Sequence, residues 1–213
     1  MQIIFIVLLT GVQVVTVISF VIAGFRQILR TRRLTRQANE LGMQFAADDL
    51  FDIPRQYADF ALISNGHSPR ANNVSYGRLD GRRVRAFDFR YEVCHGTQRL
   101  TRHYMAIAIE TDRVFPGVVM WNAHDADSAP LQARMADGRI ACWIYTGSSE
   151  TAAMLKDACH GMIDRDTSLE LSGSTFMVFA HVRHGREGYG RRLDESIRAI
   201  RVIDHPTIKS RPE

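Results

Sequence analysis

Cysteine is scarce in this chain of 213 residues, and the three cysteines stand far apart. An odd number at wide spacings does not suit a disulfide framework, so we expect Cys94, Cys142 and Cys159 to be reduced thiols of a cytoplasmic protein. Catalytic signatures are missing as well. The sequence contains neither the G-x-G-x-x-G nor the P-loop pattern of phosphate-binding loops, and no G-x-S-x-G turn for a nucleophilic serine. These absences leave the sequence without a recognisable reaction, and we expect no cofactor.

Charge is absent from a long segment at the start of the chain. Ile3 to Phe25 contains no charged residue and would span roughly 35 Å as a helix, which is enough to cross a bilayer with some tilt. A cleaved signal peptide would have a positively charged start and a small-x-small cleavage site, whereas only the amino terminus and Gln2 precede this run. A buried core helix is disfavoured because globular helices are rarely apolar on all sides over such a length. The run therefore predicts a retained transmembrane helix.

Five arginines and no acidic residue follow the uncharged run. They are Arg26, Arg30, Arg32, Arg33 and Arg36. The whole chain has a formal charge of +4, so the rest sums to 4 − 5 = −1, and we expect no nucleic acid partner. The positive-inside rule places the segment after the anchor in the cytoplasm and the N-terminus outside, as a single-pass protein of the cell (inner) membrane. Attraction of these membrane-proximal arginines to anionic lipid headgroups, about 1 kcal/mol each, is a by-product of that position.

The sequence predicts one folded domain after the anchor. We expect a transmembrane anchor over 1–25, a basic juxtamembrane helix over 26–41, an α+β domain over 42–204 and a flexible tail over 205–213. Gly42 fits the left-handed position that ends a helix. Asp52 is predicted to cap a short helix over 53–59, with Pro54 in its first turn.

From residue 60 onward the pattern is typical of strands in a mainly antiparallel sheet. Asp80-Gly81 between two β-rich runs is the strongest hairpin signal. A second hairpin is predicted to turn at Ser172-Gly173. Further single strands are predicted in DFALISNG (59–66), TRHYMAIAIE (101–110), GVVMWN (117–122) and RIACWIYTG (139–147). Helices over 150–163 and 189–203, the latter with Leu193, Ile197 and Ile200 on one side, are expected to pack on one face of this sheet.

The chain resembles a family of uncharacterised bacterial proteins that have one N-terminal transmembrane helix. The resemblance lies in ANELGMQF, ANNVSYGRLDGRRVRAFDFRYE, RHYMAIAIE and the final order of helix, hairpin and helix. The hairpin positions that match the family pattern are Gly77, Gly81, Val84, Phe87, Asp88, Phe89 and Tyr91. Phe89 replaces a tyrosine, and Cys94-His95-Gly96 replaces a plain turn. The resemblance implies the architecture and no activity, because its residues are turn glycines and sheet aromatics.

Histidine and cysteine side chains remain the candidates for a reactive or metal site. The loop between two predicted strands could bring Cys94 and His95 close to His103 as a thiolate-imidazole set or part of a zinc site. A structural zinc site needs four ligands, and no second pair with suitable spacing appears. His181 and His184 flank a predicted strand end beside several glycines, without a phosphate-loop motif. A polar loop is the favoured interpretation of each group.

Other polar clusters are explained by structure rather than by chemistry. They are Cys159 with His160, His124 with Asp125 and Asp127, and Ser148 with Ser149. The first pair lies on a predicted helix, where neighbouring side chains point about 100° apart. The second lacks the glycine and terminal glutamate of a calcium loop, and the serines suit a helix cap.

Two classes of function are compatible with these residues. The favoured one is a membrane-anchored protein whose cytoplasmic domain is a binding or interaction module. Its expected partners are the lipid bilayer and either a protein or a second copy of the chain, and no small-molecule substrate is identified. The alternative is an enzyme or metal-binding protein with a nonstandard site built from His95, His103, His181 or His184. The first is favoured because apolar periodicity explains most positions and no acid, base and nucleophile set emerges.

Overall fold

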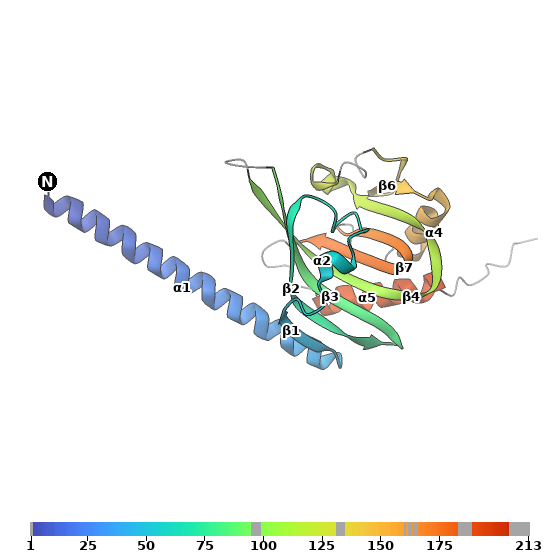
Figure 1. Ribbon diagram of the computed structural model, residues 1–213, viewed down its shortest axis with the longest axis horizontal. Coiled ribbons are helices and arrows are strands. Elements are labelled where there is room, and N and C mark those ends of the chain that lie inside the picture. Colours follow the sequence, from blue (N-terminus) through green and yellow to red (C-terminus); the bar gives the residue numbers. More distant parts are fainter. Residues whose placement is uncertain are drawn as a thin grey trace, which may run out of the picture.

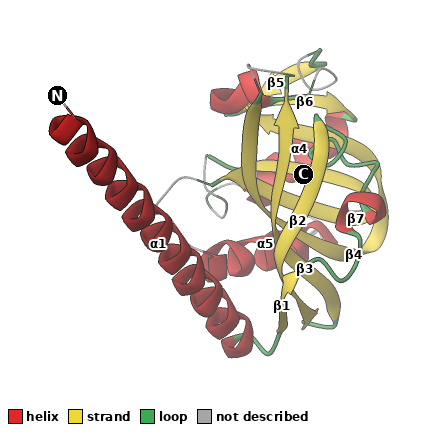
Figure 2. Ribbon diagram, turned by 60° about the vertical axis from the view of Figure 1, so that its left-hand side comes forward, coloured by secondary structure: helices red, strands yellow, loops and turns green. Residues whose placement is uncertain are grey.

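One long helix and one β-sheet define the shape of the molecule. Helix α1 spans Gln2–Glu40, and its N-terminal half projects as a rod away from the β-rich remainder (Figures 1 and 2). The computed structural model describes residues 2–94, 99–130, 135–159, 161, 163, 166–182 and 189–204. Within these ranges, the side chains of residues 2–8, 23, 26, 27, 189 and 190 lie outside the description.

The end of α1 follows the prediction made from Gly42. This residue has a φ of 66°, in the left-handed region that glycine adopts readily. Its N–H donates to Asn39 O at 3.0 Å, and the Met43 N–H donates to Ala38 O at 2.8 Å. These bonds satisfy carbonyls at the end of the helix and turn the chain back toward the sheet.

The described strands form a seven-stranded antiparallel sheet. They are β1 (Gln44–Asp48), β2 (His67–Leu79), β3 (Arg82–Val93), β4 (Leu100–Asn122), β5 (Gly138–Ile140), β6 (Trp143–Gly147) and β7 (Ser168–His181). The order is β1-β2-β3-β4-β6-β5, and β7 pairs with β4. Besides α1, the described residues form the helical elements α2 (Ile53–Gln56), η2 (Ala123–Ser128), α4 (Ser149–Cys159) and α5 (Tyr189–Asp204). This arrangement confirms the predicted α+β class.

Hydrophobic cores lie on both faces of the sheet. On one face, the C-terminal part of α1 packs together with α4 and α5, and its Leu34 joins Ile107 and Leu193 in the first core. On the other face, aromatic side chains such as Phe87 and Trp121 form the second core with α2 and the turns that follow it. α4 and α5 therefore share one face, as predicted, and the end of α1 packs with them, while the short α2 covers the other face.

The Asp80-Gly81 hairpin is confirmed. Leu79 pairs with Arg82 across the turn, and the φ angles of Asp80 and Gly81 are 53° and 81°. Two successive positive φ angles are those of a type I′ turn, whose twist matches that of the flanking strands. The turn therefore fixes the register of β2 and β3 next to it.

Two long bent strands replace several predicted short ones. β4 continues through Pro116-Gly117, where two separate strands were expected, and β7 continues through Ser172-Gly173, where a hairpin was expected. β7 pairs with β4 on both sides of the bend, and Gly173, with a φ of 57°, faces Phe115. The hairpin prediction was wrong because this glycine absorbs an irregularity in a continuous ladder rather than reversing the chain.

Three other segments also differ from the predictions. Residues 59–66 form turns rather than a strand, although Leu62 is fully buried in the second core. Residues 139–147 form the two strands β5 and β6, because the chain reverses at Ala141, which has a φ of 53°. β1 was not predicted at all.

The short helix α2 has a different cap from the predicted one. Asp52 has a left-handed backbone and makes no side-chain cap hydrogen bond. Instead, the carboxylate of Asp49 accepts from the N–H groups of Phe51 and Ile53, at 2.9 and 2.8 Å. Pro54 lies in the first turn as expected, but the helix ends at Gln56 rather than at residue 59.

Candidate functional site

The two halves of α1 have opposite environments. Large apolar side chains on its projecting half are exposed, namely Leu9, Val12, Val14, Val15, Val17, Ile18, Phe20, Val21, Ile22, Phe25, Ile28 and Leu29. Near the other end, Leu34 and Ala38 are only 5% and 1% exposed and lie in the first core. In the part of the chain that the structure describes, no helix meets the length and hydropathy expected of a membrane span.

The predicted basic residues after the uncharged run differ in their contacts. Arg30 donates to Asp88 on β3 at 2.8 Å, with 26% of the arginine side chain exposed. Arg36 lies 3.6 Å from Glu40 in an exposed pair, and Arg32 and Arg33 are exposed. The side chain of Arg26 lies outside the described residues. α1 is thus joined to the sheet through Arg30.

A buried asparagine completes the Arg30 contact. Asp88 accepts from Arg30 through one carboxylate oxygen and from Asn73 Nδ2 through the other, at 2.8 Å each. Asn73 is only 4% exposed and has a φ of 51°, at an irregularity in the pairing of β2 with β3. The sequence did not reveal these partners, because the bulge that turns Asn73 toward Asp88 leaves no local signal.

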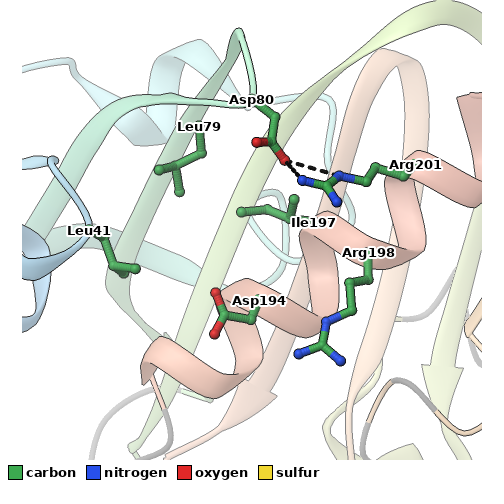
Figure 3. Close-up of a pocket in the computed structure, with 7 residues that line it drawn as sticks. All are labelled: Leu41, Leu79, Asp80, Asp194, Ile197, Arg198 and Arg201. Carbon is green, nitrogen blue, oxygen red and sulfur yellow. Dashed lines mark hydrogen bonds and ion pairs between the residues drawn. The ribbon is translucent and has the colours of Figure 1, made fainter.

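A groove opens between the turn that follows α1, the β2–β3 hairpin and α5. Its cavity volume is about 280 Å³. The lining residues are Leu41, Leu79, Asp80, Asp194, Ile197, Arg198 and Arg201. Figure 3 shows three apolar side chains, Leu41 just after α1, Leu79 on β2 and Ile197 on α5, with charged groups of both signs around them. Such a surface suits a partner segment that offers apolar side chains flanked by polar ones.

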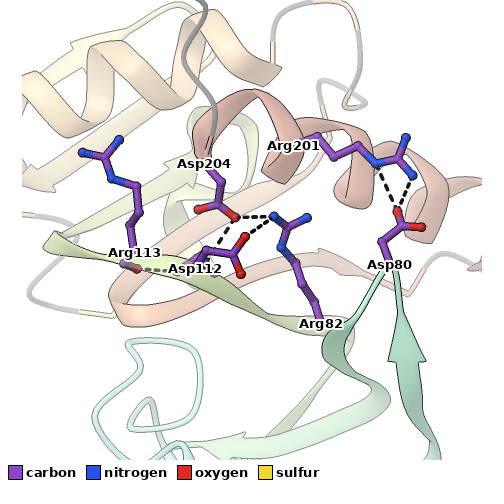
Figure 4. Close-up of polar contacts among 7 residues, drawn as sticks. Asp80, Arg82, Asp112, Arg113, Arg201 and Asp204 are labelled. Carbon is purple, nitrogen blue, oxygen red and sulfur yellow. Dashed lines mark hydrogen bonds and ion pairs between the residues drawn. The ribbon is translucent and has the colours of Figure 1, made fainter.

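Charged residues hold α5 against the hairpin next to this groove (Figure 4). Arg201 Nε donates to Asp80 at 3.0 Å. Arg82 bridges Asp112 and Asp204, at 2.6 and 2.9 Å, and the Asp204 side chain is fully buried. The Asp112 N–H also donates to Asp204 at 3.3 Å. These contacts fix the groove walls relative to one another.

The histidine candidates do not converge in the described residues. His103 and His181 belong to strands β4 and β7, where His181 pairs with Tyr104, the next residue after His103. Successive residues point to opposite faces, so the two imidazoles lie on different sides of the sheet. His181 packs edge-on against Tyr104, with ring centroids 5.3 Å apart. Partial burial, followed by the positive charge of Arg90, lowers the pKa of His103.

Other predicted candidates have structural roles or lie outside the description. His95, His160 and His184 lie outside the described residues. In the described ranges no group of three or more His, Cys, Asp or Glu residues could hold a metal ion. Cys94 is exposed and Cys159 is buried, which raises the pKa of its thiol to about 12. The structure describes all three cysteines, and none of them forms a disulfide bond.

The loop and cap predictions have clear outcomes. His124 to Asp127 lie in η2, and Asp125 accepts a hydrogen bond from Tyr104 Oη at 3.0 Å. Ser148 caps α4, because its hydroxyl accepts from the Thr151 N–H at 3.2 Å. These contacts agree with structural roles for both groups.

Glu170 is a buried acid that the sequence did not single out. Its side chain lies on β7 under the turn at Ala61, whose N–H donates to both carboxylate oxygens at 2.8 and 2.9 Å. Burial raises the pKa of Glu170 to about 8, although hydrogen bonds from the main chain of Ala61 and Leu62 oppose the shift. This acid joins the turn after α2 to the sheet.

The sheet, its helices and the contact of Arg30 with Asp88 define an α+β domain on a long N-terminal helix. No family model matches the chain, and no curated protein matches its sequence. A solved structure, that of the mycobacterial trehalose monomycolate transport factor A, TtfA, has the same fold, with a TM-score of 0.57 and 16% sequence identity. The alignment covers 82% of this chain and 92% of that chain. At this identity the likeness establishes the fold alone.

Proposed function

We propose that this protein is a membrane-anchored binding module with its domain on the cytoplasmic side. The observation that carries the proposal is the change along α1, from exposed apolar side chains in the projecting half to buried Leu34 and Ala38 in the domain. Exposed apolar surface of this extent on a helix needs an apolar environment. The uncharged run of the sequence, 3–25, has the length that the hydrocarbon core of a bilayer requires, and several of its side chains lie outside the described set.

The arginines that follow support the cytoplasmic orientation. Arg32 and Arg33 are exposed, and Arg36 makes only an exposed pair, so these residues are available to the headgroup region. Arg30 has a separate role, because its contact with Asp88 joins the anchor to the domain. The domain is therefore held close to the bilayer rather than on a flexible linker.

The groove beside α1 and α5 is the proposed partner-binding surface. Its apolar side chains Leu41, Leu79 and Ile197 are half-buried, and Arg198 on its rim is exposed. We propose a transport-related role for the complex that forms there. The shared fold with a protein described as a transport factor supports this part of the proposal. The histidine alternative is not favoured, since His103 and His181 face opposite sides of the sheet.

Topology is tested with reporters fused after Glu213 in bacterial cells. We expect a cytoplasm-dependent reporter to be active, a periplasm-dependent one to be inactive, and the chain to remain in alkali-washed membranes. A matched variant, Arg26→Gln/Arg32→Gln/Arg33→Gln, should increase the misoriented fraction while leaving the Arg30–Asp88 contact in place. Periplasmic activity of the unmodified chain would contradict the proposed orientation.

Partner binding is tested with a photo-crosslinking amino acid placed at Ile197 in the full chain. We expect a discrete adduct from the groove and none from a control at Val114, which is 80% exposed on β4. An adduct of twice the chain's mass would identify a second copy as the partner. Equal labelling from both positions would contradict a specific surface at the groove.

A further inference from the structure

Two arginines and one histidine lie in a row across the sheet. Arg70 on β2 pairs with Arg90 on β3, and Arg90 pairs with His103 on β4. Directly opposed residues project from the same face, and all three are exposed. Like charges in direct opposition destabilise a sheet, so the facing arginines Arg70 and Arg90 have a cost unless an anion lies across them.

The acidic residues next to this row on β3 have other cationic partners. Asp88, two residues before Arg90, bonds to Arg30. Glu92, two residues after it, contacts Arg99 and lies 3.6 Å from His67 Nδ1. Among the described residues, neither arginine of the row forms an ion pair. Among the described residues, the two arginines of the row therefore have no acidic side chain in direct contact.

The row lies next to the place where α1 leaves the domain. Arg30 contacts Asp88, which precedes Arg90 by two residues, and the charge of Arg30 also contributes to the lowered pKa of His103. Arg30 lies five positions after Phe25, a rise of about 7.5 Å in a helix. Figure 1 shows the end of β3 and the start of β4 on the side toward the N-terminus of α1. With the proposed anchor in the bilayer, the end of β3 that carries Arg90 therefore lies on the side of the domain toward the membrane surface.

We propose that the row of Arg70, Arg90 and His103 binds the phosphate groups of anionic phospholipids. It thereby docks the end of β3 and the start of β4 onto the bilayer. Guanidinium groups suit this ligand because their parallel N–H groups match phosphate oxygens. Leu100, which is 47% exposed at the start of β4, adds an apolar contact at the same end. The inference rests on the proposed membrane anchor and gives the domain a second, lipid-specific contact.

The test uses the full chain in nanodiscs with a fluorophore on Cys94, an exposed thiol at the end of β3, in a Cys142→Ser background. Quenching by headgroup spin labels is compared between phosphatidylcholine alone and phosphatidylcholine with phosphatidylglycerol. We expect stronger quenching with the anionic lipid. Arg70→Gln/Arg90→Gln should lower the docking constant by about fivefold for each arginine at low salt.

A matched control removes the same charge elsewhere. Arg78→Gln/Arg139→Gln changes two exposed arginines on β2 and β5, away from the row, and should leave the quenching nearly unchanged. Equal quenching in the two lipid compositions, or equal losses in both double variants, would overturn the inference.

Two further measurements separate the remaining outcomes. Resistance of the reconstituted chain to alkaline extraction reports on the anchor. Chains that insert but show no lipid-dependent quenching would overturn the lipid contact of the row and leave the proposed anchor intact. Chains that fail to insert would defeat the proposed function and this inference with it. Inorganic phosphate at matched ionic strength should not displace the anionic bilayer. Displacement at low millimolar phosphate would assign the row to a soluble phosphate ligand and overturn the lipid assignment.

Discussion

Arg30 on α1 and Asp88 on β3 are 2.8 Å apart, and this pair joins the projecting helix to the sheet. Asp88→Asn should lower the free energy of unfolding by about 1 kcal/mol, because it removes one charge from a partly buried pair. Thermal melts of the full chain in detergent measure the effect, and hydrogen exchange at residues 28–36 should accelerate. Glu40→Gln, which breaks an exposed pair with Arg36, should cost less than about 0.5 kcal/mol. Equal shifts for both variants would contradict a special role for Asp88.

The last turns of α1 are expected to contribute to the stability of the domain. Leu34→Ala should cost about 2–4 kcal/mol, because the side chain is 5% exposed in the first core. Leu50→Ala, at a position that is 64% exposed, is the matched control and should change stability by less than about 0.5 kcal/mol. Denaturant titration of the two variants measures the difference. Similar midpoints would show that α1 does not pack on the sheet in solution.

Gly81 tests the hairpin next to the groove. Its φ is 81°, and an added Cβ would meet no atom within 4 Å, so any cost of substitution comes from the backbone conformation alone. Gly81→Val should destabilise the domain by about 1 kcal/mol or more, and Gly81→Asn by less, since asparagine tolerates the left-handed region. Melting temperatures rank the three proteins. A valine variant as stable as the original would contradict the turn assignment.

Glu170 should make stability depend on pH. Burial raises its pKa to about 8 from an ordinary value of 4.5, so between these values the folded state keeps a proton that the unfolded state releases. The contribution of this group to stability should therefore be greatest near pH 4.5 and decrease as the pH rises toward 8, by at most about 1.4 kcal/mol per pH unit. Melts from pH 4.5 to 8.5 measure this slope. The difference in stability between the wild type and Glu170→Gln at each pH isolates the contribution of this carboxyl group. Parallel stability curves for the two proteins would contradict the raised pKa.

Two elements with local signals were predicted correctly from the sequence. The Asp80-Gly81 turn needs only two residues that tolerate positive φ between β-rich runs, and both φ angles have the expected sign. α5 follows from the helical spacing of Leu193 and Ile200, both of which are fully buried. In these elements the residues that specify the structure lie within a few positions of one another.

Elements that depend on distant pairing were not predicted correctly. Pro116-Gly117 and Ser172-Gly173 resemble chain reversals locally, yet both lie inside strands. Only the pairing of β4 with β7 on both sides of the bend turns these breaks into irregularities of one ladder. No periodicity within either segment reports that partner.

The row of Arg70, Arg90 and His103 was hidden by a single bulge. Ser75 pairs with Ala86, so an unbroken ladder would place Arg70 opposite Tyr91. The register shifts between Asn72 and Ser75, and Arg70 instead faces Arg90. A shift of one residue moves a side chain to the other face, and the sequence contains no direct sign of this one. The predicted basic segment could therefore be found from composition, while its continuation onto the sheet could not.

The sheet order also determines when the domain can finish folding during synthesis. β7 pairs with β4 along most of its length although other strands and a helix separate the two in the chain, and α5 supplies Leu193 and Ile203 to the first core only near the end of the chain. Arg30 leaves the ribosome long before Asp88. In the proposed topology, α1 enters the bilayer while most of its packing partners are still unmade, so the sheet assembles from a chain already fixed at one end. Tethering restricts the search for contacts to a thin layer beside the membrane, where nascent apolar strands are also exposed to lipid.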